Sequence, residues 1–224
     1  MLSQAVEDYL KIIYKLQGDG AASTSEIARA LGVSPASVTS MTRRLSELGL
    51  ANYESYRGVS LTESGTKIAL EIIRHHRLLE TYLKEVLGYP WDKMHEEAEH
   101  LEHHISEAFE DKIEELLGYP THDPHGDPIP TRDGQIAETA LDSLLDAPAG
   151  SRVRVRRVSD EDADVLHYLE DVGLLPGAVV RVIAKAPFDG PLTLEIDGTE
   201  QVVGSAIAQQ IYVAEASAPE GSQH

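Results

Sequence analysis

The feature that most constrains the fold of this chain is a change in the spacing of its apolar residues near residue 150. Before that point apolar residues recur every three or four positions, as Val6, Leu10 and Ile13 do, and this spacing predicts amphipathic helices. From Ser151 onward the apolar residues fall in short runs separated by Asp-Gly turns, which predicts strands. The 224 residues are therefore expected to form an α+β protein with more than one domain.

Two short helices, over residues 26–31 and 35–48, are predicted close to the N-terminus. Ser34 precedes the second helix and has the side chain of an N-cap residue. Two short helices joined by a tight glycine turn form a helix-turn-helix. The strand-like runs on either side of Arg57 predict a hairpin. We therefore expect a winged helix-turn-helix DNA-binding domain over residues 1–62.

The rest of the chain is expected to contain a helical part, a linker and a small β-barrel. Two long helices are predicted, over residues 62–87 and 92–117, and a short helix over residues 135–145. About five strands follow, with a helix inserted among them at residues 160–172. The expected boundaries after the first domain are a helical dimerization and metal-binding domain at 63–135, a linker helix at 136–150, a barrel at 151–215 and a polar tail at 216–224.

The segment between residues 75 and 130 has a composition that can concentrate a divalent cation. It holds eight of the ten histidines and fourteen acidic residues. Four of these have metal-ligating side chains on one helical face about 100° wide. They are His95, Glu99, Glu102 and His103. The alternative is a solvated charged face, and the absence of an HExxH motif argues against a zinc protease.

Three further residues have ligand side chains on predicted helices. His76 and Glu80 are four residues apart on the first long helix, and Asp8 lies on the N-terminal helix. The alternative for the pair is an ordinary surface contact. The alternative for Asp8 is an acid in the first helical turn, where the helix dipole favours it.

The second helix of the helix-turn-helix carries small, hydroxyl and basic side chains outside its apolar face. Small side chains permit close approach to a major groove, and Arg binds phosphate or guanine. The net charge of −19 argues against non-specific nucleic-acid binding, but residues 1–74 are neutral overall. The candidate DNA contacts are Ser34, Pro35, Ala36, Ser37, Thr39, Ser40, Arg43, Arg44 and, in the wing, Arg57. An exposed polar face that binds protein is the alternative.

In this order of elements and ligands, and in the stretch Asp-Pro-His-Gly-Asp-Pro-Ile-Pro at residues 123–130, the chain resembles the diphtheria toxin repressor family of iron- and manganese-dependent repressors. The resemblance covers nearly the whole chain. It implies a homodimer that binds palindromic operator DNA when loaded with metal, and a C-terminal Src-homology-3-like barrel. It also implies two metal sites that bridge the N-terminal and dimerization domains.

The resemblance implies the ligands of both sites. The primary site would consist of Asp8, Glu99, Glu102 and His103. The ancillary site would consist of His76, Glu80 and His95, completed by acids of the barrel. Asp162 aligns with a family glutamate, while Val165 stands where a glutamine is expected. Asp160 and Asp164 are the alternative donors.

The resemblance also bears on the choice of metal. Iron-sensing members have Met and Cys where this chain has Asp8 and Glu99, whereas manganese-sensing members have carboxylates, and hard oxygen ligands suit Mn²⁺. Two-domain manganese regulators have a glutamate at the position of Lys11, so Lys11 is expected to exclude their closely bridged pair of ions. The expected cofactor is Mn²⁺, with Fe²⁺ as the alternative and other divalent transition metals in vitro.

The function expected from these features is metal-dependent repression of metal-uptake genes, without enzymatic activity. The alternatives are a metal-dependent hydrolase that uses the His/Glu cluster and a metal-buffering protein. No recognisable nucleophile or general-base motif accompanies the cluster. The chain has no Cys, no signal-like start and no run of the roughly 18–20 apolar residues that a membrane span requires. We therefore expect a cytoplasmic protein that acts on neither a membrane nor a small organic substrate.

Overall fold

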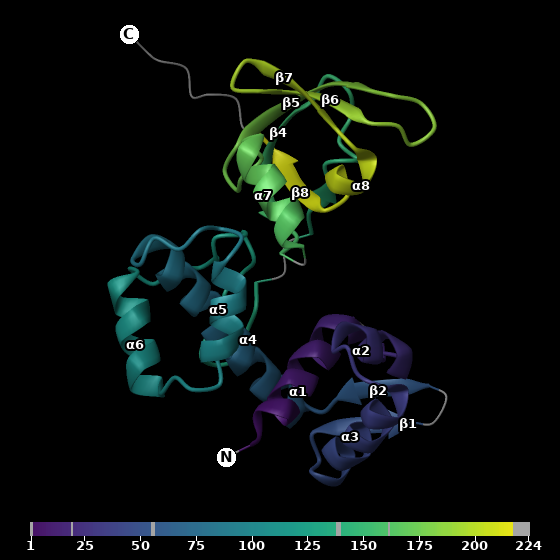
Figure 1. Ribbon diagram of the computed structural model, residues 1–224, viewed down its shortest axis with the longest axis vertical. Coiled ribbons are helices and arrows are strands. Elements are labelled where there is room, and N and C mark those ends of the chain that lie inside the picture. Colours follow the sequence, from purple (N-terminus) through teal and green to yellow (C-terminus); the bar gives the residue numbers. More distant parts are fainter. Residues whose placement is uncertain (1, 19, 55–56, 138–139, 161, 217–224) are drawn as a thin grey trace. The chain divides into compact units, whose positions relative to one another are not determined.

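The computed structural model describes residues 2–18, 20–54, 57–137, 140–160 and 162–216 (Figure 1). The predicted polar tail therefore lies outside the described residues except for Ala216. The chain forms two compact units. The first contains Met1–Leu79, Ala98–Thr121 and Ile129–Ala137, and the second contains Glu80–Glu97, His122–Pro128 and Glu138–His224.

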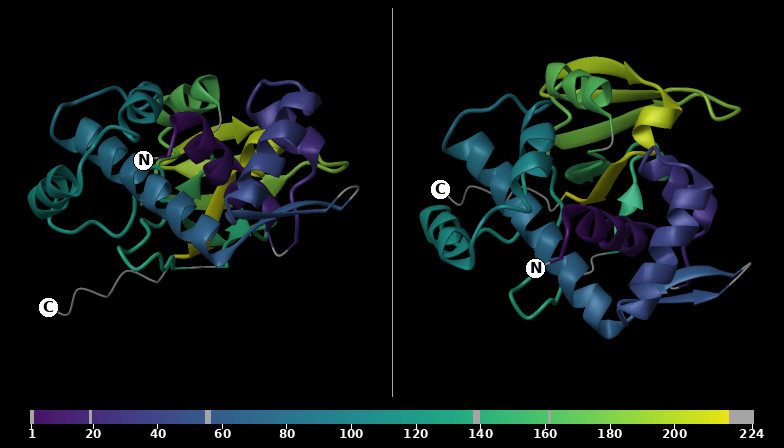
Figure 2. Two further views of the ribbon diagram at one scale, coloured as in Figure 1. Left: turned by 90° about the horizontal axis from the view of Figure 1, so that it is seen from below. Right: turned by 60° about the horizontal axis from the view of Figure 1, so that its bottom comes forward.

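A winged helix-turn-helix lies in the first unit, as predicted. Its elements are α1 (Gln4–Gln17), α2 (Thr24–Ala30), α3 (Pro35–Glu47), β1 (Ala51–Glu54) and β2 (Gly58–Leu61). The Ser23 and Glu26 side chains form a capping box at the start of α2, and Ser34 caps α3 by accepting a hydrogen bond from the Ser37 N–H. The β1–β2 hairpin projects beyond the three helices in both views of Figure 2.

The winged helix is held together by apolar side chains from its helices and its hairpin. Leu10, Ile27 and Leu45, one from each helix, are fully buried. Val59 of β2 is also buried among them. Because α1 contributes to this core with one face, its other face is free to carry polar side chains toward the helical segment that follows the wing.

The helical segment consists of α4 (Glu63–Glu85), α5 (Met94–Leu101) and α6 (Glu107–Leu116). The prediction of one helix over residues 92–117 was wrong, because a turn separates α5 from α6. The His104 N–H donates to the Leu101 carbonyl, three residues back, which tightens the end of α5. Ser106 then caps α6 by accepting from the Phe109 N–H. As a result, Glu102 and His103 lie on a turn and not on a continuous helical face.

The barrel domain in the second unit is a six-stranded antiparallel sheet. Its strand order is β3-β8-β4-β5-β6-β7. The strands are β3 (Asp142–Ser143), β4 (Arg152–Val158), β5 (Val179–Lys185), β6 (Leu192–Ile196), β7 (Thr199–Val203) and β8 (Ile211–Glu215). Irregular register in β4 and β5 bends the strands, as bulges in small barrels do. Two helices, α7 (Ala163–Asp171) and α8 (Ser205–Ala208), are inserted between strands.

The predicted linker helix within residues 136–150 is absent from the described part of that segment. Asp142 and Ser143 instead pair with β8, and the Leu144 N–H donates to the Ile211 carbonyl. Leu144 is fully buried. Edge pairing with β8 and burial of Leu144 therefore outweigh the weak helical spacing of a short segment.

The loop that contains the Asp-Pro-His-Gly-Asp-Pro-Ile-Pro stretch is fixed by its own hydrogen bonds. Asp123 Oδ1 accepts from the N–H groups of His125 and Asp127, at 2.9 Å each. Gly126 has a φ of 89°, and a Cβ there would collide with the backbone carbonyl of Arg156. This loop therefore places the His125 side chain in a defined position within the second unit.

Candidate metal centre and DNA-binding face

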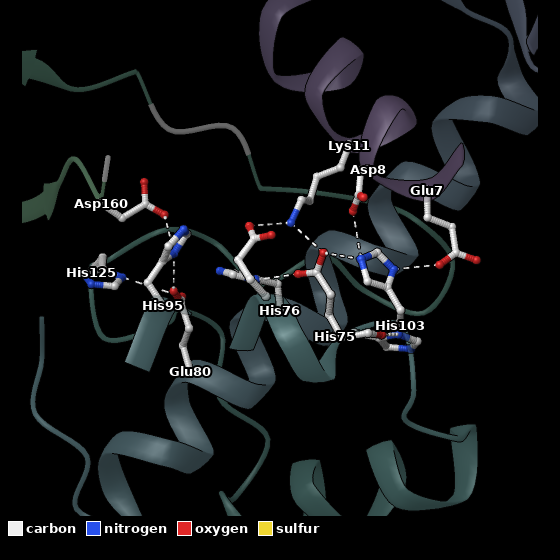
Figure 3. Close-up of polar contacts among 12 residues, drawn as sticks. Glu7, Asp8, Lys11, His75, His76, Glu80, His95, His103, His125 and Asp160 are labelled. Atoms are coloured by element: carbon white, nitrogen blue, oxygen red, sulfur yellow. Dashed lines mark hydrogen bonds and ion pairs between the residues drawn. The ribbon is translucent and has the colours of Figure 1, made fainter. Parts of the chain in front are cut away.

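The first cluster of ligand side chains lies in the first unit, where α1 meets the turn after α5. Asp8, Glu102 and His103 each offer one ligand atom, and these atoms lie within 4.8 Å of one another. His103 Nε2 is 2.9 Å from Asp8 Oδ1 and 3.3 Å from Glu102 Oε1. Asp8 is on α1, so the cluster joins the DNA-binding domain to the helical segment (Figure 3).

The ring of His103 is held by Glu7, a residue that the sequence analysis missed. Its Nδ1 lies 2.7 Å from Glu7 Oε2, in hydrogen-bond geometry (Figure 3). A histidine that donates from Nδ1 to a carboxylate presents the lone pair of Nε2 to a metal. His103 Nε2 is buried and lies against the carboxylates of Asp8 and Glu102. A buried imidazole nitrogen that faces two carboxylates favours a cation at the cluster.

Lys11 places its ammonium group among the carboxylates of the same cluster. Its Nζ lies 2.5 Å from Glu102 Oε1 and 2.7 Å from Glu99 Oε1. Burial alone would lower the pKa of Lys11, but the charges of Glu102 and Glu99 outweigh burial and raise it. Lys11 is therefore a charged ammonium beside the cluster.

Two histidines of α4 also contact Glu102. His76 Nδ1 lies 2.6 Å from Glu102 Oε2, and His75 Nδ1 lies 3.2 Å from the Glu102 backbone oxygen. Glu102 itself is fully buried. Glu102 is thus the central residue of the cluster, and ligand atoms of His76, Glu99 and Glu102 form a second triplet within 4.8 Å.

The pKa of Asp8 is raised by its position among these buried carboxylates. Burial raises the pKa of Asp8, and the charge of Glu102 raises it further. His103 and Lys11 act in the opposite direction, but the pKa of Asp8 remains above its ordinary value. A divalent cation would favour the ionised form of Asp8 more strongly than these groups do.

A second cluster lies in the second unit. His95 Nδ1 is 2.9 Å from Glu80 Oε1 and 3.7 Å from Asp160 Oδ2. Glu80 is fully buried, at the point where α4 enters this unit. His76, also expected as a ligand here, precedes Glu80 by one turn of α4.

The structure adds His125 to the second cluster, which the sequence analysis had not assigned as a ligand. His125 Nδ1 lies 3.6 Å from Glu80 Oε2, and Glu80, Asp123 and His125 form another group of ligand atoms within 4.8 Å. Burial alone would lower the pKa of His125, but Glu80, Asp123 and Asp160 raise it. The signal in the sequence was the Asp-Pro-His-Gly stretch, which was noted only as a family feature.

The structure separates the three barrel acids that were considered for this site. Asp160 is the acid that approaches His95. Asp162 instead caps α7, because its side chain accepts from the N–H groups of Asp164 and Val165. Asp164 is exposed in the first turn of α7. The structure therefore brings Asp160, and neither Asp162 nor Asp164, to the described cluster.

The predicted recognition helix presents its polar face to solvent. Ala36, Ser40, Arg43 and Arg44 are exposed, and Thr39 is partly exposed. These side chains, with Glu47, line a hollow of about 560 Å³ along α3. Ser34, Pro35 and Ser37 are exposed at the start of the helix. Arg57 is exposed at the wing and forms an ion pair with Glu54 at 3.0 Å.

Three family models match successive parts of the chain. Residues 1–59 match the iron dependent repressor N-terminal DNA binding domain. Residues 62–131 match the iron dependent repressor metal binding and dimerisation domain, and residues 143–215 match the FeoA domain.

Individual relatives and solved structures agree with these matches. The iron-dependent repressor IdeR of Mycobacterium tuberculosis (strain ATCC 25618 / H37Rv) is 35% identical over 214 residues, which is 90% of this chain and 92% of the relative. The transcriptional regulator MntR of Oceanobacillus iheyensis is 40% identical over 120 residues, 53% of this chain and 81% of the relative. A solved manganese-dependent transcriptional repressor in complex with manganese has a TM-score of 0.86 and 38% identity, covering 94% of this chain and all of that one. ScaR with bound Zn²⁺ has a TM-score of 0.79 and 38% identity, covering 94% and 99%.

Proposed function

The chain belongs to the family of iron-dependent repressors, and from that premise we propose that the Asp8–Glu102–His103 cluster is the site at which a divalent metal controls operator binding. The protein is a metal-dependent DNA-binding regulator, and its relatives include an iron-dependent and a manganese-dependent repressor. The observation that carries the proposal is the group of ligand atoms of Asp8, Glu102 and His103 within 4.8 Å of one another, in which the buried His103 Nε2 faces two carboxylates. Family membership decides against the hydrolase and metal-buffering alternatives.

The proposed mechanism follows from the elements that supply the ligands. Asp8 is on α1 of the winged helix, whereas Glu102 and His103 are on the turn after α5. A bound divalent cation offsets the repulsion between the carboxylates and so favours the arrangement in which these elements are close. Ligand binding shifts a population toward the arrangement that binds it best. In a homodimer, two recognition helices must reach major grooves about 34 Å apart, so fixing α1 favours one spacing.

The full ligand sets remain part of this proposal. We propose Asp8, Glu99, Glu102 and His103 for the primary site, and His76, Glu80, His95 and Asp160 for the ancillary site, with His125 and Asp123 beside Glu80. Carboxylates outnumber imidazoles in the primary set, and hard oxygen ligands suit Mn²⁺. Equilibrium binding of Mn²⁺ to wild-type protein, Glu102→Gln and Glu80→Gln tests the assignment. Glu102→Gln should weaken Mn²⁺ binding at the primary site, and Glu80→Gln should weaken it at the ancillary site. Wild-type Mn²⁺ binding by both variants would contradict the assignment.

Glu7→Ala is expected to weaken Mn²⁺ binding at the primary site by about 10–100-fold, the usual effect of removing a partner that orients a ligating histidine. Glu7→Gln keeps an oxygen acceptor for His103 Nδ1, so its Mn²⁺ affinity should fall less than that of Glu7→Ala. Glu63→Gln, on the exposed first turn of α4, is the control for charge alone. The measurement is a Mn²⁺ titration by calorimetry, and equal affinities of wild-type protein and Glu7→Ala would remove Glu7 from the site.

Arg43→Ala is expected to weaken operator binding and to reduce the slope of log affinity against log salt by about one unit, the effect of losing one phosphate contact. Mn²⁺ binding should stay unchanged because Arg43 is exposed on α3 and belongs to neither ligand cluster. Arg181→Ala, in the barrel strand β5, removes the same charge outside the winged helix. Fluorescence anisotropy at several salt concentrations gives both quantities. An Arg43→Ala slope equal to that of Arg181→Ala would contradict the assignment of α3 as the recognition helix.

We infer further that the regulated genes encode metal uptake and that the protein acts in the cytoplasm as a homodimer repressor. The dimerization domain of the family spans residues 62–131 and supports the dimer. None of the described helices combines the length and hydropathy needed to cross a membrane. Sequencing of DNA fragments retained by the Mn²⁺-loaded protein would identify the operators and test the proposed gene class.

A further inference from the structure

The Lys11 side chain lies among the proposed metal ligands without being able to bind metal itself. It is on α1, three residues after Asp8, and only 4% of its surface is exposed. Figure 3 shows the ammonium group extending from α1 toward the carboxylates of the cluster. An ammonium group is a donor with no lone pair, so it can only interact with the oxygens that a metal would use.

Lys11 holds the same oxygen atom that a metal at His103 would require. Its Nζ is 2.5 Å from Glu102 Oε1, and this oxygen is also the one that lies 3.3 Å from His103 Nε2. The other oxygen of Glu102 is 2.6 Å from His76 Nδ1. Both oxygens of this buried carboxylate are therefore already in contact with a nitrogen, and a cation that binds between Asp8 and His103 must share or take Oε1.

The same ammonium group contacts Glu99, the fourth proposed ligand of the primary site. Nζ lies 2.7 Å from Glu99 Oε1, and the Glu99 side chain is 39% exposed. Asp8, Lys11 and Glu99 line a pocket of about 440 Å³ beside the cluster. A metal ion and the ammonium group would both be positive charges within a few ångströms of the same carboxylates, and like charges at this separation repel strongly in a partly buried site.

We propose that Lys11 is an internal cation that competes with the divalent metal for Glu102, and that it thereby sets the metal concentration at which the protein becomes loaded. This inference rests on the proposed function of the cluster. Without metal, Lys11 offsets part of the negative charge of Glu102 and Glu99. Loading of the site moves the ammonium group away from Glu102 Oε1. Lys11 therefore acts as a specificity-determining residue for metal concentration and is not itself a ligand.

Two opposite effects of one substitution follow from this competition. Lys11→Met keeps the length and apolar stem of the side chain but removes its charge. It should bind Mn²⁺ at least about tenfold more tightly, because no ammonium group has to leave Glu102. In chelator, the same variant should unfold at a lower temperature than wild-type protein, because Glu102 is then buried without a cation. In saturating Mn²⁺, Lys11→Met should unfold at a temperature no lower than that of wild-type protein.

The test combines Mn²⁺ titration by calorimetry with thermal unfolding in chelator and in saturating Mn²⁺. Lys15→Met is the matched control, because Lys15 is exposed one turn further along α1. Lys11→Arg keeps the positive charge and should keep a Mn²⁺ affinity within about threefold of wild-type protein. It is a second variant at the same position that tests the role of the charge. We expect Lys11→Met to bind Mn²⁺ more tightly than wild-type protein and the two other variants to show no such gain. We also expect Lys11→Met to unfold at a lower temperature in chelator but not in saturating Mn²⁺.

Three outcomes would overturn the proposal. Lys11→Met with wild-type or weaker Mn²⁺ affinity would show that Lys11 does not compete. An equal gain in Lys11→Met and Lys15→Met would assign the effect to long-range charge. An equal gain in Lys11→Arg would assign it to side-chain shape. A failure of the proposed function is separate, because in that case wild-type protein itself would bind no Mn²⁺ at the cluster.

Discussion

Asp8→Ala is expected to abolish the gain in operator affinity that Mn²⁺ gives to the wild-type protein. Coupling between two binding sites typically amounts to about 1–3 kcal/mol, or roughly 5–150-fold in affinity, and the variant should lose all of it. The reason is that Asp8 is the proposed primary-site ligand supplied by the winged helix, whereas Glu102 and His103 come from the turn after α5. Operator binding in chelator should be the same for both proteins.

The fold should survive this substitution. The Asp8 side chain is 31% exposed, so its removal leaves no large cavity in the core. Burial also disfavours the charged form of Asp8, so the folded state loses little from its removal. Glu85→Ala, at the exposed end of α4, removes one acidic charge outside both ligand clusters and should keep full Mn²⁺ activation. Anisotropy titrations with and without Mn²⁺ measure the effect. A variant that still gains operator affinity from Mn²⁺ would show that Asp8 is not the connecting ligand.

Glu110→Ala is expected to lower the free energy of unfolding by about 1–3 kcal/mol, because it removes one of the two carboxylates that pair with the buried Arg74, while Glu114 remains at 2.7 Å. Arg74 is 5% exposed, and its Nε lies 2.5 Å from Glu110 Oε1. Arg74 also donates to the Pro130 carbonyl at 2.8 Å, so this group ties α4 to α6 and to Pro130 within the first unit. Urea unfolding in chelator gives the difference, with exposed Glu115→Ala on α6 as the control.

The contribution of Glu110 should also depend on pH in a defined direction. Burial raises the pKa of Glu110, but hydrogen bonds and charges from His75 and Arg74 outweigh burial and lower the pKa from 4.5 to about 2. A lowered carboxyl pKa gives stability that is complete above about pH 5 and is lost as the pH falls toward about 2. The difference in unfolding free energy between wild-type protein and Glu110→Gln should therefore shrink between pH 5 and pH 3. A difference that grows on acidification would contradict this ion pair.

The sequence predicted the winged helix well because local signals determine it. Ser34 at the N-cap and Pro35 at the first helical position placed α3, and the strand runs around Arg57 placed the hairpin. Five of the six barrel strands were also predicted close to their observed positions, and the Asp-Gly turns at residues 189–190 and 197–198 mark the two ends of β6. The predicted helices over residues 92–117 and 135–145 were wrong because apolar spacing alone does not reveal tertiary or capping contacts. Ser106 caps a separate helix, α6, and residues 142–143 pair with β8.

The residue types of the candidate metal centre were predicted from the sequence, but the way the structure groups these residues was not. His95 and Glu102 fall on one face of an ideal helix, yet the turn after Leu101 directs Glu102 and His103 toward Asp8, while His95 contacts Glu80 and Asp160. The contacts that complete the clusters join residues far apart in the chain. Glu7 with His103 and Lys11 with Glu102 are separated by 96 and 91 residues, and no local pattern indicates such pairs.

The most direct test of metal-controlled DNA binding is the affinity of the wild-type protein for an operator duplex, measured at one salt concentration in Mn²⁺ and in chelator. We predict at least about tenfold tighter binding in Mn²⁺, a difference of about 1.4 kcal/mol, with full reversal when chelator is added and full recovery when Mn²⁺ is returned. Equal affinities in Mn²⁺, Fe²⁺ and chelator would contradict the account.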